Sequence, residues 1–211
     1  MKLSKQGIAD AGIRIIGIKG QSCSGKSEAA DIIRAYFKNA IVLRADFHLF
    51  KAAADNDDLA MRVYGRTFDN VHEVLAHFMK IESIDLIERN GVLTAQCVEK
   101  MLLRDIKSLL KQNFIPNPII IESSFLGLYP QICDLITDML FVWAPKDVLA
   151  KNQMAREGKD TVEIRTTALP LSMYTSGKQG KIILNTGSLP EFKSKITDYC
   201  DFIKIASNKN F

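Results

Sequence analysis

The sequence predicts a three-layer α/β/α fold around a five-stranded parallel sheet, with two additional helical regions. Five short apolar runs recur along the 211 residues, and stretches with helical spacing separate them. Strands that alternate with helices need crossover connections, so they form a parallel sheet covered on both faces. A glycine-containing segment, G-Q-S-C-S-G-K-S, lies between the first apolar run and the first helical stretch. These observations together indicate a fold that binds phosphate groups.

The first apolar run and the helix after it frame this segment. Residues 13–18 contain four isoleucines, the β-branched composition of a buried parallel strand. Apolar residues then recur at helical spacing between Ala29 and Phe37. This spacing predicts a helix with one buried face that begins near Lys26.

The segment between them fits the whole pattern G-x-x-x-x-G-K-[ST], which predicts a phosphate-binding loop. Gly20 and Gly25 allow consecutive backbone N–H groups to curl around an oxyanion, and the following helix points its positive N-terminus at the same group. Lys26 is expected to reach the outer phosphates, and the Ser27 hydroxyl is expected to hold Mg²⁺. The residues predicted to bind the nucleotide here are Gly20, Gln21, Ser22, Cys23, Ser24, Gly25, Lys26 and Ser27.

Acidic residues follow two of the other predicted strands. These strands cover residues 40–43, 118–121, 140–143 and 181–184. Asp46 comes just after the first of them and Glu122 directly after the second. Because α/β sheets build their sites at the carboxyl ends of strands, both carboxylates are candidate site residues.

Helices are predicted near residues 69–80 and 94–112, with a break at Asn90-Gly91. Residues 52–58 form a loop or the start of a helix, a polar helix begins near Lys146, and the last helix begins near Pro190. We therefore expect a single domain over residues 1–211. It carries a helical insertion at about 52–113 and a helical region at about 146–168; the family resemblance given below implies that the first is a substrate-side insertion and the second a lid.

Composition excludes several classes of protein. The net charge is +4, and the basic residues are scattered rather than gathered on one stripe, which argues against nucleic acid as a partner. The sequence has no run of about twenty apolar residues, so it predicts no membrane span, and no secretory signal is evident. The four cysteines are widely spaced, a pattern typical of reduced intracellular thiols, so a cytoplasmic location is expected. No cluster has metal-ligand spacing, which leaves Mg²⁺ carried with the nucleotide.

Four stretches resemble the P-loop nucleoside and nucleotide kinases, and most closely the dephospho-coenzyme A kinase family. They are residues 16–27, 42–46, 139–157 and 182–189, the last reading I-I-L-N-T-G-S-L. The resemblance implies that Asp46 lies near the acceptor hydroxyl and that Arg156 is a lid arginine. It places Asn185 and Gly187 near the adenine of ATP. The chain departs from the family at Arg44, where an aspartate is usual, at Asn152, where a second lid arginine is usual, and in lacking a His-Pro pair.

The uridine kinases and their relatives are the second resemblance. Residues 46–48, Asp-Phe-His, and residues 68–70, Phe-Asp-Asn, are similar to segments of that family. This alignment puts Ala45 at the family's catalytic aspartate, which favours the coenzyme A family. Nucleosides such as uridine and cytidine remain alternative acceptors.

The resemblance implies an ATP-dependent phosphotransferase that uses Mg²⁺ and an alcohol group on a small molecule, the ribose 3′-hydroxyl of dephospho-coenzyme A, as acceptor. Lys26, Asp46 and Arg156 are its expected catalytic residues, and Ser27 and Glu122 its metal-holding residues. Each carboxylate has a structural alternative, Asp46 as a helix cap and Glu122 as a loop partner of a lysine. A nucleotide-binding switch or a degenerate kinase-like scaffold are the competing classes.

Overall fold

The structure, a computed structural model, describes residues 3–78, 83–158 and 180–208. The chain divides into two compact units. The first comprises Met1–Leu43, Pro116–Gly127 and Cys133–Phe211, and the second Arg44–Ile115 and Leu128–Ile132.

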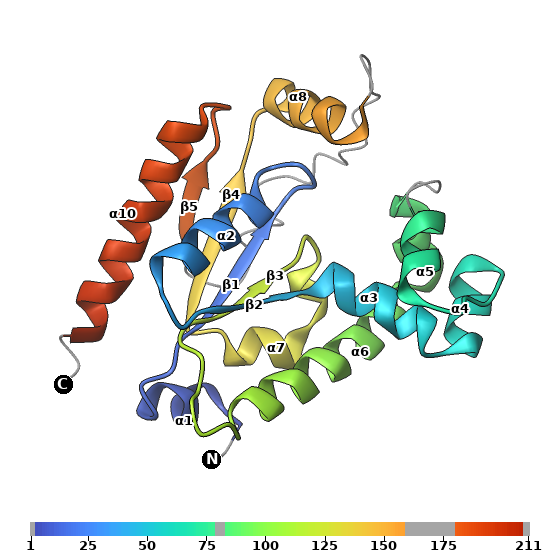
Figure 1. The fold of residues 1–211 in the computed structure, drawn as a ribbon, viewed down its shortest axis with the longest axis horizontal. Helices are drawn as coiled ribbons and strands as arrows, with labels where there is room; N and C mark the ends of the chain where they lie inside the picture. Colours follow the sequence, from blue (N-terminus) through green and yellow to red (C-terminus); the bar gives the residue numbers. More distant parts are fainter. Residues whose placement is uncertain (1–2, 79–82, 159–179, 209–211) are drawn as a thin grey trace. The chain divides into compact units, whose positions relative to one another are not determined.

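A five-stranded sheet in the order β2-β3-β1-β4-β5 forms the centre of the first unit (Figure 1). The strands are β1 (Ile15–Gly20), β2 (Ile41–Arg44), β3 (Ile119–Glu122), β4 (Asp138–Trp143) and β5 (Lys181–Leu184). β1 pairs in parallel with β3 and β4, and β4 in parallel with β5. The Asn39 carbonyl accepts from the Asn117 N–H, and the Pro118 carbonyl from the Ile41 N–H, so β2 and β3 start side by side in the same direction. The predicted α/β class and parallel sheet are confirmed.

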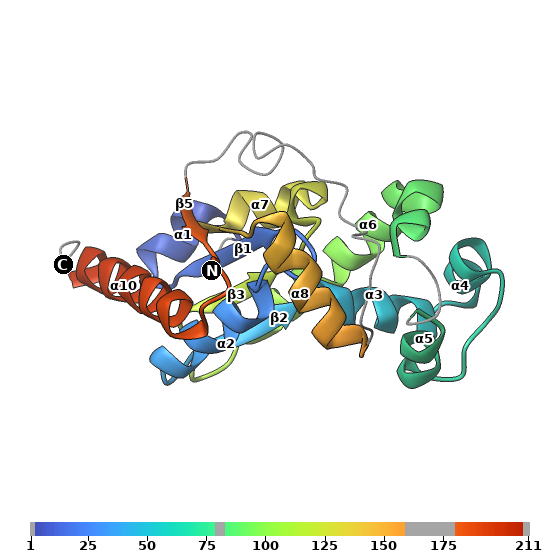
Figure 2. The same cartoon turned by 90° about the horizontal axis from the view of Figure 1, so that it is seen from above.

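Helices cover both faces of this sheet, as Figure 2 shows. α2 (Lys26–Tyr36) and α10 (Leu189–Asn208) pack on one face, where Ile33 and Phe192 are among the buried residues of one continuous core. On the other face, a Cβ at Gly17 would lie 2.5 Å from Cδ1 of Ile136. The backbone of β1 therefore approaches its neighbours closely, and only glycine fits at that position.

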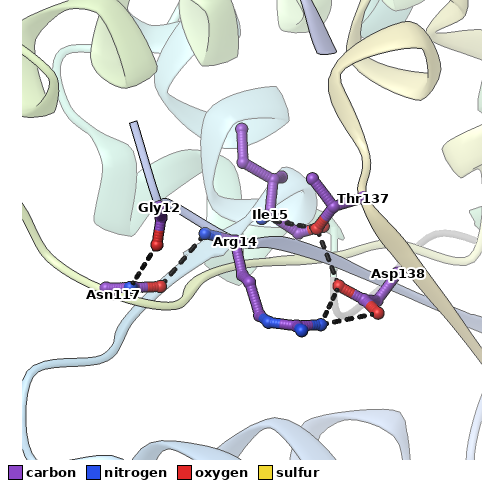
Figure 3. A network of polar contacts seen from close by, with 6 residues as sticks. All are labelled: Gly12, Arg14, Ile15, Asn117, Thr137 and Asp138. Carbon is purple, nitrogen blue, oxygen red and sulfur yellow. Dashed lines mark hydrogen bonds and ion pairs between the residues drawn. The ribbon is translucent and has the colours of Figure 1, made fainter. Parts of the chain in front are cut away.

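Polar contacts tie the amino ends of the strands together, at the edge opposite the glycine-containing loop (Figure 3). The Arg14 guanidinium donates to both carboxylate oxygens of Asp138, at 3.0 and 2.9 Å. The Asn117 side chain accepts from the Arg14 N–H at 3.0 Å and donates to the Gly12 carbonyl at 2.9 Å. These bonds fix the starts of β1 and β4 and the segment before β3.

The described residues of the second unit include the helices α3 (Ala45–Ala54), α4 (Asp57–Tyr64), α5 (Val71–Phe78) and α6 (Ser83–Leu109). Its core includes a cluster of buried residues from three of the helical segments and the link between two of them, namely Ala53, Ala60, Phe68 and Val74. α4 begins at Asn56, whose side chain accepts from the Leu59 N–H at 3.0 Å, and ends at Gly65 with φ +73°. Both ends follow ordinary capping chemistry. The predicted insertion at 52–113 falls within this unit.

Several predicted boundaries were wrong. The helix α6 continues through Asn90-Gly91 instead of breaking there, because a helix interior tolerates one glycine at a cost of about 1 kcal/mol. The helix α8 (Lys146–Glu157) covers the first part of the predicted lid and ends at Gly158 with φ +64°; the rest of that prediction lies outside the described residues. The pattern missed α1 (Lys5–Asp10), α7 (Pro130–Leu135) and the short helix η1 (Leu126–Leu128), which are too short for periodicity to reveal.

In the described parts of the chain, no helix has the length and apolar character needed to cross a membrane.

Candidate phosphate-binding site

The loop between β1 and α2 requires glycine at both ends. A Cβ at Gly20 would collide with the Val142 carbonyl oxygen of the neighbouring strand and lie 2.9 Å from Ser24 Oγ. Gly25 adopts φ +100°, where side chains are strained, and a Cβ there would lie 2.8 Å from Asn185 Nδ2. The two glycines therefore have separate steric causes, and the loop closes tightly against β4 and the end of β5.

The loop backbone turns sharply between these glycines. The Ser24 N–H donates to the Gln21 carbonyl at 3.2 Å. Cys23 has φ +61°, and among the described residues it is the one residue other than glycine with positive φ. Successive residues with left-handed and right-handed backbone form a concave row of N–H groups that attracts anions. The first turn of α2, beginning at Lys26, adds its own N–H groups and the positive end of the helix dipole.

Lys26 folds back over the loop that it follows. Its side chain is only 7% exposed, and its Nζ donates to the Gln21 carbonyl at 2.7 Å. Two buried side-chain atoms of the described loop, Gln21 Oε1 and Ser24 Oγ, have no hydrogen-bond partner. Buried polar atoms without partners are costly, so their presence here is consistent with a loop built to meet a polar ligand.

Ser27 and Glu122 meet at the carboxyl edge of the sheet. Ser27 Oγ donates to Glu122 Oε1 at 3.1 Å, and Glu122 is 6% exposed. In the described residues no group of three or more His, Cys, Asp or Glu side chains could enclose a metal ion. One hydroxyl and one carboxylate fit Mg²⁺, which commonly takes few protein ligands and completes its shell with phosphate oxygens and water.

Asn185 and Gly187 lie beside the loop. Asn185 Nδ2 donates to the Ser24 carbonyl at 2.9 Å, and Asn185 Oδ1 accepts from the Gly187 N–H at 3.0 Å. Gly187 has φ +93°, a conformation that favours glycine. Both polar atoms of the Asn185 amide thus bond within the protein, and this residue supports the loop between β1 and α2 from the turn after β5.

Two predicted catalytic residues lie on other elements. Asp46 is the second residue of α3 and belongs to the second unit; its side chain lies outside the described part of the structure. Arg156 is exposed in the last turn of α8, in the first unit.

The structure adds Asn152 and Lys19 to the surroundings of the loop. Asn152 Nδ2, on α8, donates to the Cys23 carbonyl at 2.9 Å. Lys19 directly precedes Gly20, and its Nζ lies 3.1 Å from where a Cβ of Gly127 would be. Burial lowers the pKa of Lys19, and the negative charge of a Cys133 thiolate would act in the opposite direction. The signal for Lys19 was a lysine next to the end of an otherwise apolar strand. In the sequence, Asn152 stands out only as a departure from the resembled family, and no local pattern indicates its contact with the loop.

Comparison with known proteins supports the fold. No family model matches the chain, and neither does any curated protein. Among solved structures, TT1252 from Thermus thermophilus is 22% identical with a TM-score of 0.58, and the match covers 89% of this chain and 96% of that one. A dephospho-CoA kinase from Campylobacter jejuni is 15% identical with a TM-score of 0.54, over 91% of this chain and 98% of that one.

These similarities place the chain in the α/β class with a parallel five-stranded sheet, an architecture shared with the Campylobacter kinase. At identities this low, they establish the fold alone. The activity has to be argued from the site.

Proposed function

We propose that this protein is an ATP-dependent kinase that transfers the γ-phosphate to a hydroxyl of a small molecule. The observation that carries the proposal is the loop from Gly20 to Ser27. Its two glycines pack too closely against their neighbours to admit a side chain, and Ser27 is hydrogen-bonded to the buried Glu122. Phosphoryl transfer requires positioned positive charge and oriented N–H groups more than covalent chemistry. This loop offers both.

The nucleotide's phosphates would bind the loop N–H groups and the first turn of α2. Lys26 would leave the Gln21 carbonyl, 2.7 Å away, and place its ammonium on the outer phosphates. That exchange replaces a neutral acceptor by a charged one, which strengthens the hydrogen bond. Ser27 and Glu122 would hold the magnesium ion, directly or through water. Bound there, the ion supplies neutralising charge to the phosphates.

In the proposed transfer the acceptor oxygen forms a bond to the γ-phosphorus while the bond to the β–γ bridging oxygen breaks. ADP keeps that oxygen, and the hydroxyl proton passes to the Asp46 carboxylate. Arg156 would stabilise charge on the transferring group from the last turn of α8. Exclusion of water by a closing lid would prevent hydrolysis of ATP.

The acceptor proposed is the ribose 3′-hydroxyl of dephospho-coenzyme A. Support comes from the sequence segments that resemble that kinase family, at residues 42–46 and 182–189. Uridine or cytidine is the alternative acceptor, supported by residues 46–48 and 68–70. A panel of dephospho-coenzyme A, pantothenate, uridine, cytidine and nucleoside monophosphates, with release of ADP as readout, distinguishes these acceptors.

Nucleotide binding is tested first, by thermal unfolding with ATP and Mg²⁺. At a ligand concentration a hundred times Kd, stability should rise by about 2.7 kcal/mol. A scaffold that has lost the site would show no shift, and a switch would show the shift without transfer to any acceptor.

Two substitutions test the roles within the site. Lys26→Ala should abolish transfer, whereas Lys38→Ala, at an exposed lysine beyond the end of α2, should leave it unchanged. Asp46→Asn should retain nucleotide binding and lower kcat by roughly a hundredfold or more, against Asp58→Asn on α4 as control. Full activity of Asp46→Asn with every acceptor would show that Asp46 is not the general base.

A further inference from the structure

A side-chain amide from the lid helix holds one peptide of the phosphate loop. Asn152 lies in α8, and its Nδ2 donates to the Cys23 carbonyl at 2.9 Å. Cys23 and Asn152 are 129 residues apart in the chain. The bond therefore connects two elements that sequence neighbourhood does not hold together.

The Cys23 side chain contacts the same helix. It packs against a buried apolar cluster of Ala144, Val148 and Leu149, at the start of α8. Cys23 also has φ +61°, which costs a residue with a Cβ about 1 kcal/mol or more and persists only where surrounding contacts enforce it. The apolar cluster and the Asn152 amide are the contacts that enforce it here.

A second amide acts on the next carbonyl of the loop. Asn185 Nδ2 donates to the Ser24 carbonyl at 2.9 Å from the turn after β5. In a trans peptide the C=O and the following N–H point in opposite directions. Two consecutive carbonyls held by outside donors therefore set the directions of the Ser24 and Gly25 N–H groups. The Ser24 N–H closes the turn onto the Gln21 carbonyl, which Lys26 Nζ also contacts.

We propose that Asn152 is a positioning residue for nucleotide binding. Its amide holds α8 against the phosphate loop, residues 20–27, and keeps Cys23 in its left-handed backbone conformation. The inference deepens the proposed function and rests on it for the identity of the ligand. It also gives a role to one departure from the resembled kinase family, in which an arginine is usual at this position. A short uncharged amide supports the loop backbone, where an arginine would bring a charge.

The test compares two asparagines that make the same kind of bond. Asn152→Asp keeps the shape of the side chain but replaces the donor by an oxygen facing the Cys23 carbonyl, and Asn152→Ala removes the donor without adding charge. Asn117→Asp is the matched control: Asn117 Nδ2 donates to the Gly12 carbonyl at the same 2.9 Å, at the opposite edge of the sheet (Figure 3).

Binding of MgATP is the first readout, by calorimetry. We expect Asn152→Ala to bind about tenfold more weakly, the size of one net hydrogen bond, and Asn152→Asp to bind more weakly still, because its carboxylate repels the Cys23 carbonyl. Asn117→Asp should bind as the wild type does. Asn117→Asp should instead lower the melting temperature of the ligand-free protein. Wild-type affinity in both Asn152 variants, or an equal loss in Asn117→Asp, overturns the proposal.

Alkylation of Cys23 in ligand-free protein is the second readout, followed by peptide mass spectrometry so that Cys97 and Cys133 are resolved separately. Release of the Cys23 peptide from α8 should speed its labelling several-fold in the Asn152 variants and leave it unchanged in Asn117→Asp. Unchanged labelling in every variant overturns the docking role. If wild-type protein binds no nucleotide, the proposed function fails, while the labelling still decides whether Asn152 holds the loop.

Discussion

Gly25 meets two separate requirements in a single residue. Its φ of +100° strains any residue with a Cβ, and the space that a Cβ would fill is closed by Asn185 Nδ2 at 2.8 Å and by the Phe192 ring at 3.3 Å. Phe192 belongs to the core between α10 and the sheet. A side chain at Gly25 would therefore disturb the phosphate loop and the packing beneath it together.

Gly25→Ala should destabilise the protein more than backbone strain alone accounts for. Gly65→Ala is the control, because Gly65 has a similar φ of +73° with nothing within 4 Å of its Cβ position. We expect about 1 kcal/mol for Gly65→Ala and roughly 2–4 kcal/mol for Gly25→Ala, measured by urea unfolding. Equal losses would mean that the Asn185 and Phe192 contacts give way without cost.

Helices α3 and α6 are connected through a buried histidine. His48 is 5% exposed, and its Nδ1 lies 2.9 Å from the Arg44 carbonyl oxygen, directly before α3. Its Nε2 lies 3.0 Å from Asp105 Oδ2 on α6. The first turn of α3, which contains Asp46, is thus fixed by both its own backbone and the neighbouring helix. Both ring nitrogens of His48 contact groups of the protein itself, which gives this residue a structural role.

His48→Phe should retain the ring volume and lose both polar contacts. The expected cost is about 1–3 kcal/mol, since the Arg44 carbonyl and the Asp105 carboxylate lose a partner. His72→Phe serves as the control, because His72 is exposed on α5 and should change stability by less than about 0.5 kcal/mol. Chemical denaturation at neutral pH measures both. A loss no larger in His48→Phe than in His72→Phe would contradict the structural role.

For the molecule as a whole, two residues on the buried face of α10 should make the folded state less stable at alkaline pH. Cys200 is fully buried, and burial, with the charge of Asp201, raises the pKa of its thiol from 9.0 to about 12. Burial, with the charges of Asp138 and Cys200, also raises the pKa of Tyr199 above its usual 10.0. Above pH 9 the unfolded chain loses the thiol proton and the folded chain keeps it, so stability falls as the pH rises.

Between pH 8 and pH 10 this thiol should cost about 1 kcal/mol of unfolding free energy. Cys200→Ala should remove that part of the pH dependence, while Tyr199 adds its own only above about pH 10. Burial lowers the pKa of Lys19, which has the opposite sign, and its contribution cancels when the two proteins are compared. Parallel stability curves for wild type and Cys200→Ala over this range would exclude the effect.

Local patterns were sufficient for the sheet and the loop. β-branched runs gave all five strands within about two residues, and β5 (Lys181–Leu184) at its predicted bounds. Hydrophobic periodicity and turn signals predicted a break at Asn90-Gly91, where α6 in fact continues. They also missed α1 and α7, each of which is shorter than two turns. A short or interrupted helix depends on what it packs against, and periodicity does not report packing.

Residues 20–27 of this chain determine by themselves that a tight, glycine-containing loop forms between a strand and a helix, because glycine sterics and helix geometry act over a few residues. The bond between Ser27 and Glu122, and the asparagine amides on the Cys23 and Ser24 carbonyls, come only from tertiary structure. Their partners are 95 to 161 residues away in the sequence. Hydrogen bonds are directional and short-ranged, so which groups meet is decided only when strands and helices pack.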